Sequence, residues 1–317
     1  MKGAGVAPDR VGQPLLSPAE VTRLLAEGVR APEQRLRRVA VDGRVGEQAG
    51  RRLGGGLDYA ETRSYQSGDE PRHVHWRATA RTGRLQVRRH HQDVAPVACL
   101  VVDRRAGMRF GTRVRLKVAQ AARLALYLAG GDVRRGTEVA ALLVDEPNLW
   151  LPPAGGSRAL HRLARCLVQP CRPMDADPSA RPLASTIGSL AGRLSPGGTL
   201  TVISDFSDLM PADAVQLARL GRRYDCRAHL IYDPAEVRVP PIGPLAVRWA
   251  GHEHALDWRD PPQRAAHERA FSDRQAALSA LLVGALWQVA TLDASREDLA
   301  AALSSGDGGE RAAVPRH

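Results

Sequence analysis

From residue 95 onward, apolar runs of strand length alternate with stretches in which apolar residues recur at helical spacing. Residues 97–103 (VACLVVD) have the continuous apolar character of a buried strand, and residues 114–129 have the period of a helix. The same pattern predicts further strands at 137–144, 199–205, 226–232, 246–249 and, at an edge, 287–291, and helices at 157–168, 184–194, 212–222, 261–284 and 296–303. This alternation predicts an α/β fold in which helices cover both faces of a parallel sheet.

The amino-terminal third of the chain has a different pattern. Ser17 and Pro18 are typical of a helix start, and the apolar spacing after them predicts one amphipathic helix within residues 17–40. Residues 43–92 are rich in Gly and Arg, which indicates a small β-rich module of short strands and turns. We therefore expect three parts, namely the amino-terminal region (1–94), the α/β domain (95–304) and a disordered tail (305–317).

The composition is that of a folded protein. Of the 317 residues, 44% are apolar, and no apolar run reaches the ~18 residues that a membrane span needs. The amino terminus lacks the apolar segment of a secretory signal, so we expect a cytoplasmic location. The four cysteines have no Cys-x-x-Cys spacing, which predicts reduced thiols rather than a zinc site or disulfides.

The formal charge of +11 makes nucleic-acid binding an alternative, because a basic surface attracts phosphate groups. Aromatic residues make up only 4% of the chain, which leaves few rings on which bases could stack. An acidic protein partner would satisfy the same charge. The charge by itself therefore does not select between these two classes of partner.

Residues 63–85 (RSYQSGDEPRHVHWRATARTGRL) form a signature that no helix or strand period requires. Its arginines offer fork-shaped donors, and its Tyr and Trp offer flat apolar faces with one polar atom each. Gly-Asp in the middle is typical of a turn. We expect the segment to be cross-braced by its own side chains, and its marked positions are Arg63, Tyr65, Gly68, Asp69, Arg72, Trp76 and Arg81.

Together with Gly54–Tyr59 (GGGLDY), Ala80 and Val87, these positions closely resemble the hallmark of the domain of unknown function 58 (DUF 58) family. The chain departs from the hallmark at His75, where the family has an acid, and at His90 to Gln92, where acids are usual. The resemblance implies a short form without the two membrane helices of many relatives. It also implies a partner, a MoxR-type AAA+ ATPase, and a role in the assembly or maturation of protein complexes.

Asp103 and Asp205 each end an apolar strand, at the sheet edge where ligands of parallel sheets gather. Their placement resembles the von Willebrand factor A fold, in which an Asp-x-Ser-x-Ser loop, a Thr and a second Asp hold one divalent cation. Here Arg105 and Gly107 stand at the positions of the two serines, and Ser157 is the only hydroxyl near the Thr loop. Magnesium needs about six oxygen ligands. We therefore predict a degenerate, metal-free site in which Arg105 neutralises both carboxylates, with magnesium binding as the alternative.

Other chemistry has weaker support. The chain has no phosphate-binding Gly-x-x-x-x-Gly-Lys loop and no Gly-x-Ser-x-Gly elbow around Ser204. A zinc site would need His73, His75, His90 and His91 to meet across two extended segments. We expect a protein-interaction adaptor that is not an enzyme and carries no cofactor. The alternatives are a metal-dependent hydrolase at Asp103 and Asp205, or a basic nucleic-acid-binding protein.

Overall fold

The computed structural model describes residues 13–31, 59–65, 74–90, 97–112, 114–171, 181–241, 243–249 and 252–305. The chain divides into two units, one formed by residues 1–39 with 96–317 and one formed by residues 40–95. The predicted tail lies outside the described residues from 306 on.

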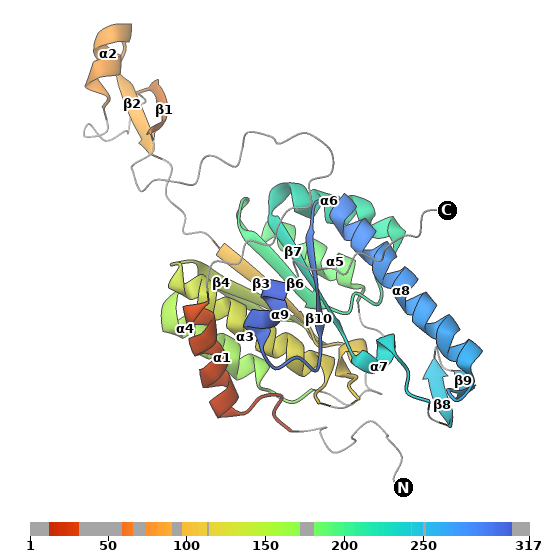
Figure 1. Ribbon diagram of the computed structural model, residues 1–317. Coiled ribbons are helices and arrows are strands. Elements are labelled where there is room, and N and C mark those ends of the chain that lie inside the picture. The colour runs from red at the N-terminus through yellow and green to blue at the C-terminus, as the bar shows by residue number, and fades with distance from the viewer. Residues whose placement is uncertain are drawn as a thin grey trace. The chain divides into compact units, whose positions relative to one another are not determined.

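The larger unit is built on a six-stranded sheet with the order β10-β7-β6-β3-β4-β5 (Figure 1). All pairings are parallel except that of β5 with β4. Numbered by their order in the chain, the strands run 3-2-1-4-5-6, the doubly wound order, and the direction of winding reverses between β3 and β6. The strands are β3 (Val97–Asp103), β4 (Glu138–Val144), β5 (Leu149–Ala154), β6 (Thr199–Ser204), β7 (Asp225–Tyr232) and β10 (Gln288–Asp293).

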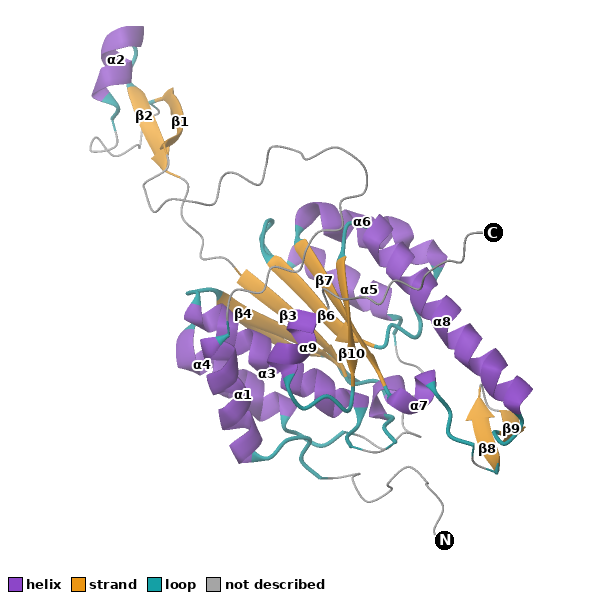
Figure 2. Cartoon of the chain, in the orientation of Figure 1, coloured by secondary structure: helices purple, strands orange, loops and turns teal. Residues whose placement is uncertain are grey.

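Helices cover both faces of this sheet, which confirms the predicted α/β class (Figure 2). Successive residues of a strand point to opposite faces, so Leu100 and Val102 enter one buried cluster while Cys99 and Val101 enter the other. The first cluster is closed by α1 (Pro18–Arg30), α3 (Lys117–Arg134), α4 (Gly156–Leu167) and α9 (Leu299–Ser305), and the second by α5 (Leu183–Gly188), α6 (Ala214–Arg223) and α8 (Pro261–Gly284).

Helix α1 belongs to this unit, although the sequence analysis groups it with the signature region. A Cβ added to Gly28 would lie 2.0 Å from the backbone oxygen of Tyr127, so the backbones of α1 and α3 approach at a distance that only glycine allows. Leu24 is fully buried, and Glu20 pairs with the buried Arg123 at 2.7 Å. The smaller unit therefore begins after α1, near residue 40, and not at residue 1, where the predicted amino-terminal part begins.

The shorter elements of the larger unit include two strands that the sequence did not predict. Strand β5 (LWLPPA) contains two prolines, which are tolerated because it is an edge strand. Strand β9 (HEHALD) is too polar to show a strand period. The predicted helix 184–194 is split in two. The shorter elements are η4 (Ala106–Arg109), η6 (Ser189–Gly192), η7 (Pro211–Asp213), α7 (Pro234–Val237), and the hairpin of β8 (Pro244–Trp249) with β9 (His252–Asp257).

In the smaller unit, β1 (Tyr59–Ser64) pairs antiparallel with β2 (Gln86–His90), and a short helix α2 (Trp76–Thr82) precedes β2. His75 caps α2, since its Nδ1 accepts a hydrogen bond from the Ala78 amide at 3.2 Å. The helix ends at Gly83, whose φ of 67° is left-handed.

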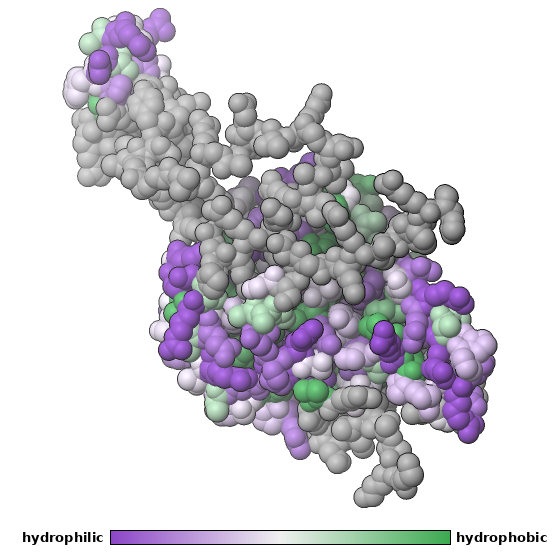
Figure 3. Space-filling view, in the orientation of Figure 1, coloured by the Kyte–Doolittle hydropathy of each residue, from purple (hydrophilic) through white to green (hydrophobic). Residues whose placement is uncertain are grey.

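Hydrophilic side chains gather on the surface over α4 and over the amino-terminal end of α8 (Figure 3). Within the described part of the chain, no helix combines the length and the apolar character that crossing a membrane requires.

Candidate functional site

Asp103 lies at the carboxyl end of β3 and is 1% exposed. The Ser204 hydroxyl, at the end of the adjacent strand β6, donates to Asp103 Oδ2 at 2.6 Å. The backbone amide of Arg105 donates to Asp103 Oδ1 at 3.0 Å. Because β3 and β6 are neighbouring parallel strands, their ends bring these groups together at the point where the sheet reverses its winding.

Arg105 binds two carboxylates at once. Its Nε and Nη2 donate to the two oxygens of Asp103 at 3.0 and 2.8 Å, and its Nη1 and Nη2 donate to those of Asp208 at 2.6 and 3.0 Å. Burial alone would lower the pKa of the Arg105 guanidinium, but its hydrogen bonds with Asp208 and Asp103 outweigh burial and raise it. Burial alone would raise the pKa of Asp208, but the hydrogen bond from Arg105 outweighs burial and holds this pKa below its ordinary value of 3.8. The charged forms are therefore the stable ones.

Asp205 is held by a different cation. The Lys117 ammonium, at the first position of α3, lies 2.9 Å from Asp205 Oδ2 and 2.9 Å from Glu236 Oε1. Burial would lower the pKa of Lys117, yet Asp205 and Glu236 raise it. Burial would raise the pKa of Asp205, but Lys117 and the Ser207 amide lower it. A cation at a helix amino terminus opposes the helix dipole, so these two carboxylates are what stabilise Lys117 there.

The prediction that Arg105 neutralises both Asp103 and Asp205 is therefore wrong for Asp205. The second carboxylate bound by the Arg105 guanidinium is that of Asp208, and Asp205 is bound by Lys117 instead. In the sequence, Asp208 lies far from Arg105 and Lys117 lies far from Asp205, and no regular spacing connects the members of either pair. One signal was available, because Lys117 is one of only two lysines in an arginine-rich chain.

Of the other two predicted metal-site positions, Gly107 lies at the strand-end site and Ser157 does not. A Cβ at Gly107 would lie 2.9 Å from Asp205 Oδ2 and 3.3 Å from Ser207 Oγ, so this loop passes directly over Asp205. Ser157 lies in the first turn of α4 and lines a hollow whose lining includes neither Asp103 nor Asp205. Ser157 is therefore not part of the strand-end site.

Aspartates recur along the whole edge. Every parallel strand of the sheet ends on an aspartate or is followed directly by one, and each of these carboxylates is hydrogen-bonded within the chain. Asp145 pairs with Arg109 at 3.1 Å, and Asp233 accepts from the Thr112 hydroxyl at 2.6 Å. The row consists of Asp103, Asp145, Asp205, Asp233 and Asp293. We call it the strand-end aspartate row; of its five members, only Asp103 and Asp205 were predicted from the sequence.

Asp103 is paired with Arg105, and Asp205 is paired with Lys117. A divalent cation could therefore bind both carboxylates only by displacing a guanidinium and an ammonium group. Among the residues the structure describes, no three His, Cys, Asp or Glu side chains converge as a metal site. For the zinc alternative, His75 is the cap of α2, whereas His73 and His91 lie outside the described residues.

The signature residues are only partly described. Trp76 is 68% exposed, and Tyr65 and Arg81 are exposed as well, so these three side chains are not buried. The internal brace stays a prediction, because the side chains of its other members are not described. Arg63 lies in β1, and Gly68, Asp69 and Arg72 lie outside the described residues. An exposed tryptophan is more typical of a contact surface than of a structural support.

Comparison with known proteins gives a family and several relatives. The family model described as "Protein of unknown function DUF58" matches residues 61–277. Uncharacterised proteins of Mycobacterium bovis and Mycobacterium tuberculosis are each 29% identical over 262 residues, which is 80% of this chain and 80% of the relative.

Two solved structures from Bacteroides species are more distant. The conserved hypothetical protein BatB of Bacteroides thetaiotaomicron is 11% identical, with a TM-score of 0.41 over 67% of this chain and 96% of its own. An aerotolerance-related membrane protein of Bacteroides fragilis is 14% identical, with a TM-score of 0.39 over 68% and 96%.

Proposed function

The chain belongs to this DUF58 family, as its signature residues predicted, and from that premise we propose that it is a non-enzymatic adaptor that binds other proteins. In this proposal, a von Willebrand A-like unit presents the carboxyl edge of its sheet to the partner and uses no metal cofactor. The strand order and the single antiparallel strand β5 support the von Willebrand A-like assignment.

One observation carries the proposal, which is that every carboxylate of the strand-end aspartate row already has partners within the chain: Asp103, Asp145 and Asp205 pair with cations, and Asp233 and Asp293 accept hydrogen bonds from neutral donors. A metal-dependent hydrolase needs carboxylates that are free to bind a metal, and a general base needs one that can exchange protons near neutral pH. Here Asp205 and Asp208 have pKa values below 3.8, because Lys117 and Arg105 bind them in spite of burial. Such carboxylates hold the edge together, which favours a recognition surface over a reactive one.

The partner that the family resemblance implies is a MoxR-type AAA+ ATPase. Two apolar side chains on loops at the carboxyl edge suit a protein contact, since Met210 is 61% exposed and Val114 is 43% exposed. Isolated exposed apolar residues are common, so the surface needs a direct test with a matched control.

The test is co-purification of the tagged chain with a purified MoxR-type ATPase from the same organism, with and without ATP and magnesium. Met210→Glu places a charge on the carboxyl edge. Leu286→Glu is the control, because Leu286 is also 61% exposed but lies just before β10, at the opposite edge of the sheet.

We expect the native chain and Leu286→Glu to retain the ATPase, and Met210→Glu to lose at least about tenfold in affinity, the cost of a charge in an apolar contact. Equal binding by both variants would move the contact away from this edge. Failure of the native chain to bind under any nucleotide condition would exclude the ATPase as a direct partner.

A further inference from the structure

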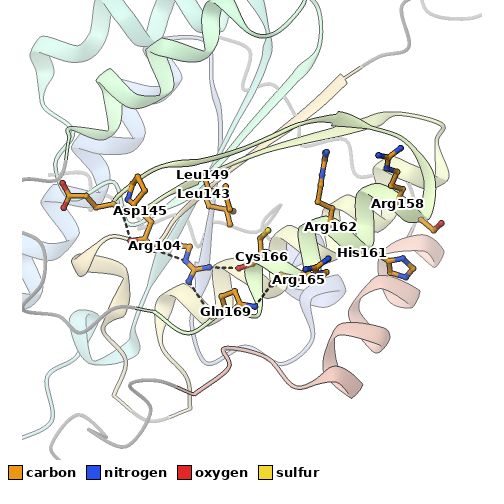
Figure 4. A pocket seen from close by; sticks show the side chains of 13 residues that line it. Arg104, Leu143, Asp145, Leu149, Arg158, His161, Arg162, Arg165, Cys166 and Gln169 are labelled. Atoms are coloured by element: carbon orange, nitrogen blue, oxygen red, sulfur yellow. Dashed lines mark hydrogen bonds and ion pairs between the residues drawn. The ribbon is translucent and has the colours of Figure 1, made fainter.

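A hollow of about 890 Å³ lies between α4 and the β4–β5 hairpin (Figure 4). Leu143 and Leu149 of the hairpin form part of its apolar wall, and Cys166 lies on its helical side. Four basic side chains of α4 line it as well: Arg158, His161, Arg162 and Arg165. The hollow is therefore apolar on one side and basic on the other.

The basic residues share one side of α4 because Arg158 and Arg165 each lie three or four residues from both His161 and Arg162. Ala159, Leu163 and Leu167 occupy the opposite side and are buried in the core. Figure 4 shows Arg158 and Arg162 rising from α4 toward the strands of the hairpin. The core packing of α4 thus fixes the direction in which the arginines point.

No acidic residue in the described part of the chain pairs with these arginines. Across the described ranges, Arg158, Arg162 and Arg165 form no ion pair. Arg162 donates to the backbone oxygen of Pro152, and its buried Nε has no hydrogen-bond partner. Among the described residues, no carboxylate therefore neutralises these three guanidinium groups.

At the inner end of the hollow, the charged side chains of Arg104 and Asp145 already have partners within the protein. Arg104 is buried there, and its guanidinium donates to the backbone oxygens of Cys166 and Gln169 at 2.9 Å each. Asp145 pairs with both Arg104 and Arg109, so its negative charge is already compensated. The lining also includes the carboxylate of Glu146, so its described arginines, Arg104, Arg158, Arg162 and Arg165, outnumber its carboxylates by four to two. The net charge of the hollow is therefore positive, and most of it comes from α4.

The helix start adds to this potential. Gly155 is the N-cap residue of α4 and offers no side-chain hydrogen bond, and the first turn contains no acidic residue. Helix amino termini carry partial positive charge and free N–H groups. Ser157 in this turn lines the same hollow.

The chemistry of the lining indicates the class of ligand. Guanidinium groups recognise carboxylates or phosphates through paired hydrogen bonds. Among the described residues that line the hollow there is no Phe, Tyr or Trp on which a base could stack, which argues against a nucleotide or single-stranded nucleic acid. From Arg158 to Arg165 the helix rises by roughly 10 Å, a length that about three or four residues of an extended peptide span.

We propose that this hollow binds an acidic segment of a partner protein, with Asp or Glu side chains paired to Arg158, Arg162 and Arg165. The apolar wall of the hairpin would contact the segment's remaining side chains. This site is independent of Met210 and of the proposed ATPase contact, so the two proposals can fail separately.

The test uses the full chain and a fluorescein-labelled peptide of about eight alternating Asp and Glu residues, long enough to cross the hollow in extended form. Binding is followed by fluorescence anisotropy. Arg158→Glu with Arg165→Glu reverses two exposed charges of the hollow. Arg219→Glu with Arg222→Glu, on the exposed side of α6, changes the net charge equally and is the matched control. Thermal unfolding checks that both variants are folded.

We expect the α4 variant to lose at least about tenfold in affinity and the α6 control less than about twofold. The bound peptide should also slow alkylation of Cys166, which lines the hollow, and leave that of Cys171 unchanged. Equal losses in both variants, or an unchanged alkylation rate at Cys166, would overturn the proposal. So would equal binding of a single-stranded oligonucleotide that is lost in the same variant, since the hollow would then accept any polyanion.

Discussion

The carboxyl edge of the sheet and the hollow beside α4 both contain arginines, but they use them in opposite ways. Arg105 is almost buried and binds two carboxylates, whereas Arg158 and Arg165 are exposed and bind no carboxylate of the residues that the structure describes. A buried charge must be compensated within the fold, and an exposed charge is compensated by water until a ligand replaces it. The comparison teaches that in this protein the paired charges serve stability and the unpaired ones are available for recognition.

The largest effect should come from removing a paired charge. Lys117→Met would leave Asp205 and Glu236 close together without their shared cation. We expect the free energy of unfolding to fall by about 3 to 5 kcal/mol, because the variant buries uncompensated carboxylates. Urea denaturation at pH 7 measures it.

The matched variant for that measurement is Arg158→Glu with Arg165→Glu. It changes more charge, but at exposed positions, and should alter the free energy of unfolding by less than about 0.5 kcal/mol. If both variants were equally destabilised, the distinction between paired and unpaired charges would be wrong.

A smaller effect is expected from pH. The pKa of Asp208 is lower in the folded protein than its ordinary 3.8, mainly through the hydrogen bond from Arg105, which outweighs burial. A carboxyl whose folded pKa is depressed stabilises the fold above its unfolded pKa and loses that contribution as the pH falls through the folded pKa.

Asp208→Asn keeps the shape of the side chain and removes its titration. We expect it to be about 1 to 2 kcal/mol less stable than the native protein at pH 7, and the difference to vanish as the pH falls below the folded pKa of Asp208. Unfolding curves of both proteins between pH 7 and acid conditions provide the measurement. A difference that stayed constant with pH would show that Asp208 acts through packing alone.

The smallest effect concerns magnesium. Because two cations neutralise the edge separately, replacing one should not create a metal site. Arg105→Ser with Lys117→Ser should bind magnesium weakly, adding about 1 kcal/mol of stability at about fivefold excess over the dissociation constant. Each single variant should show no gain.

Melting temperatures with and without magnesium test this, and circular dichroism confirms that the double variant is folded. If Arg105→Ser alone bound magnesium, Lys117 would not be the second cation that blocks the site.

The sequence predicted those parts of the fold that local pattern determines. Strand β3 is a continuous apolar run that ends at Asp103, and β6, in which Leu, Val and Ile stand between Thr and Ser, ends next to Asp205, so the sheet, its edge and two aspartates of the row could be located. The pairing partners could not be. Lys117 and Asp208 reach their partners only through packing of α3 and of the loop after β6, which no local pattern encodes.

The hollow could not be predicted from the sequence, for a related reason. The arginines of α4 look like any solvated helix face, and only the position of the β4–β5 hairpin turns that face into the wall of a cavity. The hairpin in turn depends on β5, whose two prolines hide its strand character.

The glycine contact between α1 and α3 has a consequence for the chain as a polymer. Because α1 is fixed to the larger unit before residues 40–95 begin, and β3 returns to it after they end, those residues form a closed insertion rather than an amino-terminal extension. The entropy cost of closing such a loop grows only with the logarithm of its length, by about 0.6 kcal/mol per doubling. The larger unit can therefore accept insertions of very different length at this point at an almost constant entropy cost. The smaller unit is free to change in size without unfolding the larger one.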